Sequence, residues 1–196
     1  VKTGEIKMGD KVNYIVPTGN FGNILAGYYA KQIGLPVNKL VCASNDNNVL
    51  YDFIQSGEYN RKRNFLKTIS PSMDILISSN LERLLYYASG CDNAYIKEIM
   101  DELNTKGSYK VKEDVLKSIQ ENFTCGYATN EQTAETIKTV YEKDDYLLEP
   151  HTAVAYKVLL DDVDKEHKNV VLSTASPYKF TDSVYHSLHS DDAGDE

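Results

Sequence analysis

The residues with the clearest chemical potential form a glycine-rich loop, Thr18-Gly19-Asn20-Phe21-Gly22-Asn23. Its glycines permit positive φ angles and let a ligand come close to the backbone. Consecutive backbone N–H groups of such a loop can converge on an anion, and a helix that starts directly after it adds the positive end of its dipole. The side chains of Asn20 and Asn23 supply further amide donors. The loop therefore predicts a site for a phosphate group.

This loop differs from two common phosphate-binding motifs. A Walker loop requires Gly-Lys-Ser/Thr, a tripeptide that the chain does not contain, and a dinucleotide fingerprint requires G-x-G-x-x-G, whereas the loop has only Gly19-x-x-Gly22. A plain glycine turn between a strand and a helix is an equal alternative on these residues alone. The physics selects a phosphate without naming the compound that carries it.

The elements around the loop predict how it is positioned. Residues 12–16 are a β-branched and aromatic run typical of a strand, residues 24–33 have the apolar spacing of a helix, and residues 39–43 predict a second strand. Strand, loop, helix and strand form a βαβ unit with parallel strands. Further strands are predicted at 73–77, 125–128 and 169–173, and further helices at 49–55, 81–90, 95–103, 111–119, 130–141, 151–160 and from Pro177 onward. A turn at Gly107 and Ser108 is expected between two of these helices, and Thr129 with Gln132 has the spacing of a capping box before the helix at 130–141.

This alternation predicts an α/β fold with a mostly parallel sheet flanked by helices. Residues 1–189 are expected to form this unit, and residues 190–196 an acidic, disordered tail. The net charge of −8 argues against a nucleic-acid partner, and no apolar run is long enough to cross a membrane. Three widely spaced cysteines without a CxxC pair argue against a disulfide framework or a zinc site, and no metal site is expected. These features predict a cytoplasmic protein.

Four motifs, in order along the chain, resemble threonine synthase. They are Val16-Pro17-Thr18-Gly19-Asn20-Phe21-Gly22-Asn23, Met73-Asp74-Ile75 with Ser78-Ser79-Asn80-Leu81-Glu82-Arg83, Glu149-Pro150-His151-Thr152-Ala153, and Ser173-Thr174-Ala175-Ser176-Pro177 with Lys179-Phe180. The first motif is similar to that family's phosphate loop and is the most specific of the four. It also favours threonine synthase over a sibling enzyme such as a threonine dehydratase.

The resemblance implies a tryptophan-synthase-β-like fold, here partial, and pyridoxal 5'-phosphate (PLP) as the cofactor. It implies a carbon–oxygen lyase that converts O-phosphohomoserine and water to threonine and phosphate. Carried over to this chain, the loop residues Gly19, Asn20, Phe21, Gly22 and Asn23 are expected to hold the cofactor phosphate. Thr174 is expected to contact the pyridine nitrogen, and Glu149 to lie near the cofactor.

The chain also departs from the family pattern. Ser176 replaces a histidine, Glu149 replaces an aspartate, and the family's Schiff-base lysine is expected upstream, in an N-terminal part that this sequence does not contain. Lys11, Lys31 and Lys179 are interpreted as surface residues. We therefore expect a fragment with no catalytic residue of its own, inactive alone, with homo-oligomer formation possible. The alternative is a stand-alone, non-catalytic module that binds phosphate or PLP.

Two further polar groups have open interpretations. His151 lies at the start of a predicted helix, where either a catalytic role or a structural role fits, and the structural role is favoured. The asparagine-rich stretch at residues 45–48 follows a predicted strand, so it fits a ligand-binding loop and a simple turn equally well. His167 has no metal-ligand spacing with carboxylates in the sequence.

Overall fold

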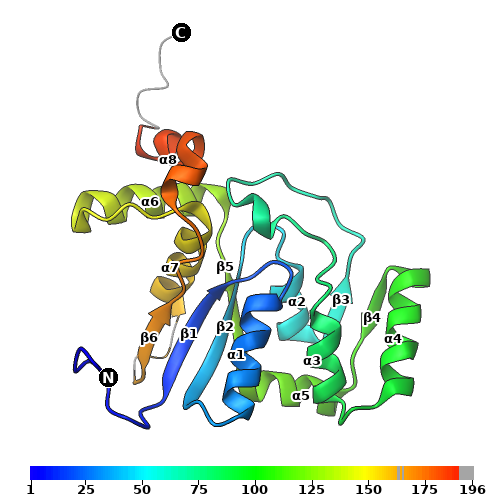
Figure 1. Ribbon diagram of the computed structural model, residues 1–196. Helices are drawn as coiled ribbons and strands as arrows, with labels where there is room; N and C mark the ends of the chain where they lie inside the picture. Colours follow the sequence, from blue (N-terminus) through cyan, green and yellow to red (C-terminus); the bar gives the residue numbers. More distant parts are fainter. Residues whose placement is uncertain (163, 165, 190–196) are drawn as a thin grey trace.

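A four-stranded sheet forms the centre of the computed structural model, which describes residues 1–162, 164 and 166–189 (Figure 1). The tail expected at 190–196 lies outside these residues. The strand order is β5-β2-β1-β6, and every pair is parallel. The strands are β1 (Val12–Pro17), β2 (Val37–Ser44), β5 (Phe123–Tyr127) and β6 (Lys168–Val171). The predicted α/β class with a parallel sheet is thus confirmed.

Helices cover both faces and the ends of this sheet. The α-helices are α1 (Gly22–Gln32), α2 (Val49–Ser56), α3 (Leu81–Ala88), α4 (Asn93–Lys106), α5 (Glu113–Asn122), α6 (Asn130–Asp144), α7 (Pro150–Asp162) and α8 (Thr181–Leu188). Two short 3₁₀ helices, η1 (Pro71–Met73) and η2 (Pro177–Phe180), complete the described elements. Each α-helix predicted from the sequence is present with shifted bounds.

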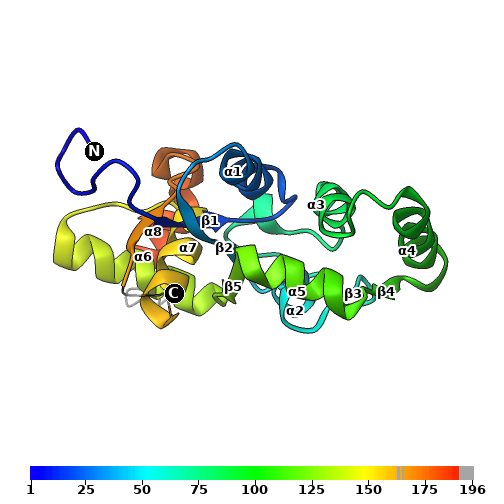
Figure 2. The ribbon, with the colours of Figure 1, turned by 90° about the horizontal axis from the view of Figure 1, so that it is seen from below.

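The alternation of side chains along the strands explains how the two faces are covered. Ile15 of β1 packs with Val154 and Val158 of α7 in one core cluster. Its neighbour Val16 packs with Ile24 of α1 in another. Because consecutive strand residues point to opposite faces, α1 and α7 cover opposite sides of the sheet (Figure 2). The glycine loop joins β1 to α1 and therefore lies between two elements that are both fixed in the core.

A second, two-stranded antiparallel sheet lies beyond the main one, next to α3 and α4 (Figure 1). It pairs β3 (Glu58–Asn60) with β4 (Ser108–Lys110). The rings of Tyr59 and Tyr109 stack across the pair with centroids 5.4 Å apart. Three-residue strands are too short to give a sequence pattern, so the prediction of a plain turn after Gly107 missed this pairing.

The strand predicted at residues 73–77 is wrong. The chain there forms η1, whose first residue is Pro71, and then continues as an irregular segment. Met73 is buried in the core, but Ile77 is exposed. The Asp74 carboxylate accepts hydrogen bonds from Asn45, Asn47 and Thr68, which hold the backbone in a turn.

The predicted capping box at the start of α6 is confirmed. The Thr129 side chain accepts from the N–H of Gln132, and the Gln132 side chain accepts from the N–H of Thr129. Such a cap stabilises a helix by about 1 kcal/mol. None of the described helices is both long enough and apolar enough to span a lipid bilayer.

Candidate functional site

The candidate site lies where the topology of the sheet reverses. The chain passes from β1 to β2 on one side, whereas β6 pairs with the other side of β1. The carboxyl ends of these parallel strands lie at one edge of the sheet. Open α/β sheets place ligands in the crevice at such a switch point. Here the glycine loop follows β1 and Thr174 follows β6, and both line the same cavity.

The glycine loop is held in shape by its first residue. Thr18 donates its N–H to the carbonyl of Ala43 at 2.8 Å, and its hydroxyl donates to the carbonyl of Val16 at 2.6 Å. Phe21, the residue directly before α1, has a left-handed backbone with φ 63° and a buried ring. The first helical hydrogen bond runs from the N–H of Leu25 to the carbonyl of Phe21. The N–H groups of the preceding first turn are therefore available to an anion.

Gly19 is required by a close approach to the backbone of a distant segment. A Cβ atom at this position would lie 2.7 Å from the carbonyl oxygen of Ser72 and 3.1 Å from the Cα of Met73. Any side chain would push η1 away from the loop. Gly22 has more room, because the nearest atom to a Cβ there would be Asn80 Nδ2 at 3.4 Å. The two glycines of the loop therefore have different roles.

The cavity at this edge has a volume of about 380 Å³, within the range of small-molecule sites. Its described lining residues are Pro17, Thr18, Gly19, Asn20, Phe21, Gly22, Asn23, Ile24, Ser72, Met73, Asn80, His151, Thr174, Ala175, Lys179 and Phe180. This lining combines backbone N–H groups, side-chain amides, hydroxyls and a lysine, and none of these residues carries a carboxylate. Such a donor set suits an anionic ligand, and its glycine loop suits a phosphate.

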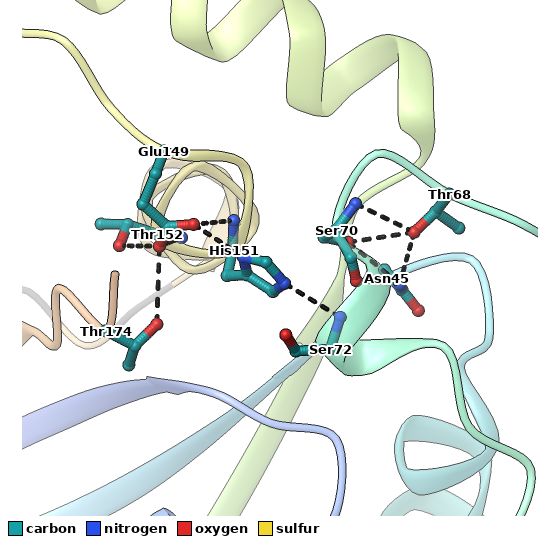
Figure 3. A network of polar contacts seen from close by, with 8 residues as sticks. All are labelled: Asn45, Thr68, Ser70, Ser72, Glu149, His151, Thr152 and Thr174. Atoms are coloured by element: carbon teal, nitrogen blue, oxygen red, sulfur yellow. Dashed lines mark hydrogen bonds and ion pairs between the residues drawn. The ribbon is translucent and has the colours of Figure 1, made fainter. Parts of the chain in front are cut away.

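A buried carboxylate lies behind the cavity. Glu149 is 1 % exposed and caps the start of α7, where its side chain accepts from the N–H groups of His151 at 2.9 Å and Thr152 at 2.7 Å (Figure 3). The hydroxyl of Thr152 also donates to it. Burial alone would raise the pKa of Glu149, but the hydrogen bonds from His151 and Thr152 lower that pKa below its ordinary value.

The ring of His151 connects this carboxylate to the cavity wall. Its Nε2 accepts from the backbone N–H of Ser72 at 3.1 Å, so Nδ1 carries the proton and donates to Glu149 at 2.6 Å (Figure 3). Ser72 in turn lies against Gly19. Both ring nitrogens have protein partners, which favours the structural interpretation of His151. Glu149 also approaches the cavity wall directly, because its Oε1 lies 3.5 Å from Thr174 Oγ1.

The asparagine side chains after β2 form hydrogen bonds within the protein and do not line the cavity. Asn45 Nδ2 lies 2.9 Å from Thr68 Oγ1 and 3.0 Å from Ser70 Oγ (Figure 3). Asn47 Nδ2 donates to the carbonyl of Leu66 at 2.8 Å. These bonds fix the long segment that leads to η1, and they favour the simple-turn interpretation of residues 45–48.

The structure brings the predicted cofactor-binding residues together, although they are 150 residues apart in the chain. Gly19, Asn20, Phe21, Gly22, Asn23 and Thr174 all line the cavity. Glu149 lies behind the wall, two residues from the lining residue His151. Sequence reasoning missed Ser72, Asn80 and Phe180, whose contribution depends on contacts between distant segments.

The three lysines considered from the sequence differ in position. Lys11 is exposed at the start of β1, and Lys31 donates to the carbonyl of Asn38 at 3.0 Å. Lys179 is exposed, as interpreted from the sequence, but it also lines the cavity. Its ammonium group lies 5.6 Å from the centre of the Phe180 ring. Lys179 therefore adds a positive charge to the cavity that the surface interpretation did not include.

His167, for which the sequence predicts no metal-ligand spacing, has two acidic neighbours in the structure. His167 Nδ1 lies 2.5 Å from Asp164 Oδ2, and Glu166 completes a group whose ligand atoms all lie within 4.8 Å of one another. The group lies before β6, at the amino end of the strands. Hydrogen bonds from the Glu166 backbone and from His167 lower the pKa of Asp164. Exposed ion pairs of this kind are common, and the group is separate from the cavity.

Comparisons with known proteins agree with the motifs. The family model "Threonine synthase, C-terminal" matches residues 152–195. Threonine synthase of Saccharomyces cerevisiae is 43% identical over 199 residues, an alignment that covers 93% of this chain and 39% of the yeast protein. Human threonine synthase-like 1 is 40% identical and is matched over 96% of this chain and 25% of its own length.

Solved structures give the same result. PLP-bound threonine synthase from Brucella melitensis superposes with a TM-score of 0.90 at 44% identity, covering 95% of this chain and 39% of that one. Yeast threonine synthase superposes with a TM-score of 0.88 at 40% identity, covering 100% of this chain and 42% of the other. The chain therefore spans about two fifths of these relatives, and its similarity to threonine synthases extends over nearly its whole length.

Proposed function

We propose that this chain supplies the cofactor-phosphate half of a threonine synthase. The whole enzyme would use PLP to convert O-phosphohomoserine and water to threonine and phosphate. The observation that carries the proposal is the cavity itself, which has a glycine loop at one end, Thr174 in its wall and no carboxylate among its described lining residues. Its donors and its size are compatible with a pyridine ring that carries a phosphate group.

The loop would hold the phosphate of PLP. Three features support this assignment: Gly19 sits too close to η1 for any side chain, Phe21 takes up the left-handed turn, and the first N–H groups of α1 have no helical acceptor. Together they converge donors and a helix dipole on one point. The amides of Asn20 and Asn23 would add to this set. Lys179, which also lines the cavity, would contribute a positive charge.

Thr174 would contact the ring nitrogen. A hydroxyl can donate to or accept from that nitrogen, so it does not impose a protonated ring as a carboxylate would. PLP, when bound, supplies the electron sink for chemistry at the substrate carbon. The residues of this chain bind and orient, and Glu149 and His151 keep Thr174 and η1 in a fixed relation. The lysine that holds the cofactor covalently would come from the N-terminal part of the enzyme, so the chain alone would be inactive.

The first test is ligand-dependent melting of the chain. PLP and inorganic phosphate are expected to raise the melting temperature, and pyridoxal without its phosphate is not. At about 100 times the dissociation constant, the ligand adds ~2.7 kcal/mol, which corresponds to roughly 5–10 °C for a chain of this size. Thr174→Ala should reduce the effect of PLP and leave the effect of phosphate unchanged. No stabilisation by PLP would contradict the proposal.

The alternative is a stand-alone module that binds phosphate or PLP without chemistry. Activity separates the two. The chain by itself should release no phosphate from O-phosphohomoserine. The chain joined to the region that precedes it in the longer relatives should release phosphate from that substrate. Binding of PLP without activity in the joined protein would favour the module.

A further inference from the structure

Three consecutive residues at the entry to α3 bond the phosphate loop from outside. The hydroxyl of Ser78 donates to the carbonyl of Gly19 at 3.0 Å. Ser79 donates both its N–H, at 2.6 Å, and its hydroxyl, at 2.8 Å, to Asn20 Oδ1. Asn80 Nδ2 donates to the carbonyl of Asn20 at 2.8 Å. The loop, 59 residues earlier in the chain, is thus held by a clamp made of residues 78–80.

The clamp is itself anchored in the core. The N–H of Ser78 donates to the hydroxyl of Tyr59 at 2.8 Å, and that hydroxyl donates to the carbonyl of Leu76. Tyr59 is 1 % exposed, and Leu81, which starts α3, is 2 % exposed. Residues 78–80 are therefore fixed from both ends. Because these residues also bond the glycine loop, the loop is held in a fixed position relative to the core.

The bonds from Ser79 decide how the Asn20 amide is turned. A backbone N–H can only donate, so the atom that faces it must be the carbonyl oxygen of the amide. Asn20 lines the cavity, and its oxygen is engaged by two donors from Ser79. The NH₂ group is the part of this amide that is left for a ligand. An anion would meet two N–H donors there, whereas the reversed amide would present a repelling oxygen.

We propose that Ser79 is a positioning residue, which locks the Asn20 amide with its NH₂ group toward the cavity and so fits the loop to a phosphate. This inference deepens the proposed function and rests on it. It assigns no chemistry to Ser79, which acts only through Asn20. This role is not visible in the local sequence, because serines before a helix are ordinary capping residues.

The test uses substitutions that separate the lock from the fold. Asn20→Asp keeps an oxygen for both Ser79 donors but replaces the NH₂ group by a second oxygen. The melting temperature without ligand should stay close to that of the unmodified chain, and phosphate and PLP should bind about 100-fold more weakly. Ser79→Ala loses one of the two bonds to Asn20 Oδ1 and should weaken binding of both ligands by about tenfold.

Rescue and a matched control complete the design. Ser79→Thr keeps the hydroxyl and should bind both ligands like the unmodified chain, a recovery that a merely structural serine would not explain. Ser89→Ala removes a serine hydroxyl that bonds the carbonyl of Tyr86 at the far end of α3, and it should leave binding unchanged. Dissociation constants are measured by calorimetry with inorganic phosphate and with PLP.

The outcomes separate this inference from the proposed function. Unchanged phosphate binding in Ser79→Ala, or in Asn20→Asp, would overturn the role of Ser79 even if PLP binds. Binding of phosphate but not PLP by the unmodified chain would contradict the threonine synthase proposal. The role of Ser79 in orienting the Asn20 amide would then still be tested by phosphate binding to the variants. If neither ligand binds the unmodified chain, both proposals fail.

Discussion

His151 donates a 2.6 Å hydrogen bond from Nδ1 to Glu149 within a buried pair at the start of α7. The pair links two sides of the cavity. His151 reaches Ser72 beneath the phosphate loop, and Glu149 lies within 3.5 Å of the Thr174 hydroxyl. The loop and Thr174 come from distant parts of the chain, so the pair connects the two segments that would hold the ends of the cofactor in the proposed function.

Replacing Glu149 by glutamine should destabilise the chain by roughly 2–4 kcal/mol. The amide retains one oxygen, but its NH₂ group would face donors from His151 or Thr152. Chemical denaturation measures the loss. Glu142→Gln, at an exposed position on α6, removes the same charge and should change stability by less than about 0.5 kcal/mol. Equal effects of the two substitutions would show that the buried network contributes little.

The stability of the chain should fall in acid because of the same carboxylate. Its pKa in the folded state lies below the ordinary value of 4.5. Near that pH, the unfolded chain binds more protons than the folded one, so protons favour unfolding as the pH drops below 4.5. The difference in free energy of unfolding between the unmodified chain and Glu149→Gln should be largest at neutral pH and should decrease as the pH falls below 4.5. A difference that is independent of pH would contradict the assignment.

Gly19→Ala should destabilise the chain by about 1–3 kcal/mol and weaken phosphate binding, because the new methyl group would meet the backbone of Ser72 at 2.7 Å. Gly22→Ala is the matched control within the same loop. Its methyl group would have no neighbour nearer than 3.4 Å, and the position is helical, so the fold should keep its stability or gain some. Melting of both variants without ligand checks the difference.

At Phe21, glycine should be more stable than alanine by about 1 kcal/mol, although both lose the buried ring at a cost of ~3–5 kcal/mol. The backbone there has φ 63°, which glycine adopts without a Cβ clash. The opposite order holds at an ordinary helical residue, so Ala26→Gly in α1 should lose ~1 kcal/mol. Chemical denaturation of Phe21→Gly, Phe21→Ala and Ala26→Gly gives the free energy of unfolding of each variant. A Phe21→Ala variant that is more stable than Phe21→Gly would refute the strained turn.

The three thiols should react with a thiol reagent in a fixed order. Cys91 is exposed and should react first. Burial raises the pKa of Cys125 to about 11 and that of Cys42 to about 12. The thiolate is the reactive form, so Cys42 should be modified only after unfolding. Mass spectrometry of peptides labelled in the native and the unfolded state gives the order, and early labelling of Cys42 would show that the sheet opens.

The sequence was informative where local physics decides the structure. The glycine loop after residues 12–16, the helix that follows it and the Thr129 capping box are set by neighbouring residues, and all three predictions agree with the structure. Thr174 could be assigned to the site only through the resemblance. Nothing in the sequence around Thr174 shows that the end of β6 meets a loop about 150 residues earlier in the chain.

The failures have a physical pattern as well. The apolar run at residues 73–77 resembles a strand, but Pro71 and the bonded Asp74 carboxylate hold it in a turn. Ser79 resembles a helix cap, yet its donors are used on Asn20. The partners Asn45 of Asp74 and Asn20 of Ser79 lie far away in the sequence, so no window of neighbouring residues contains them.

The pairing of β1 with β6 has a consequence for biosynthesis. Asn13 in β1 and Asn169 in β6 bond each other across 156 residues. At about 5–20 residues per second, a ribosome needs roughly 8–30 s to add that length. During this delay β1 can already pair with β2, but its other edge has no strand beside it and could recruit a foreign one. The strand that carries the phosphate loop is therefore a vulnerable surface of the nascent chain, which a chaperone would have most reason to shield.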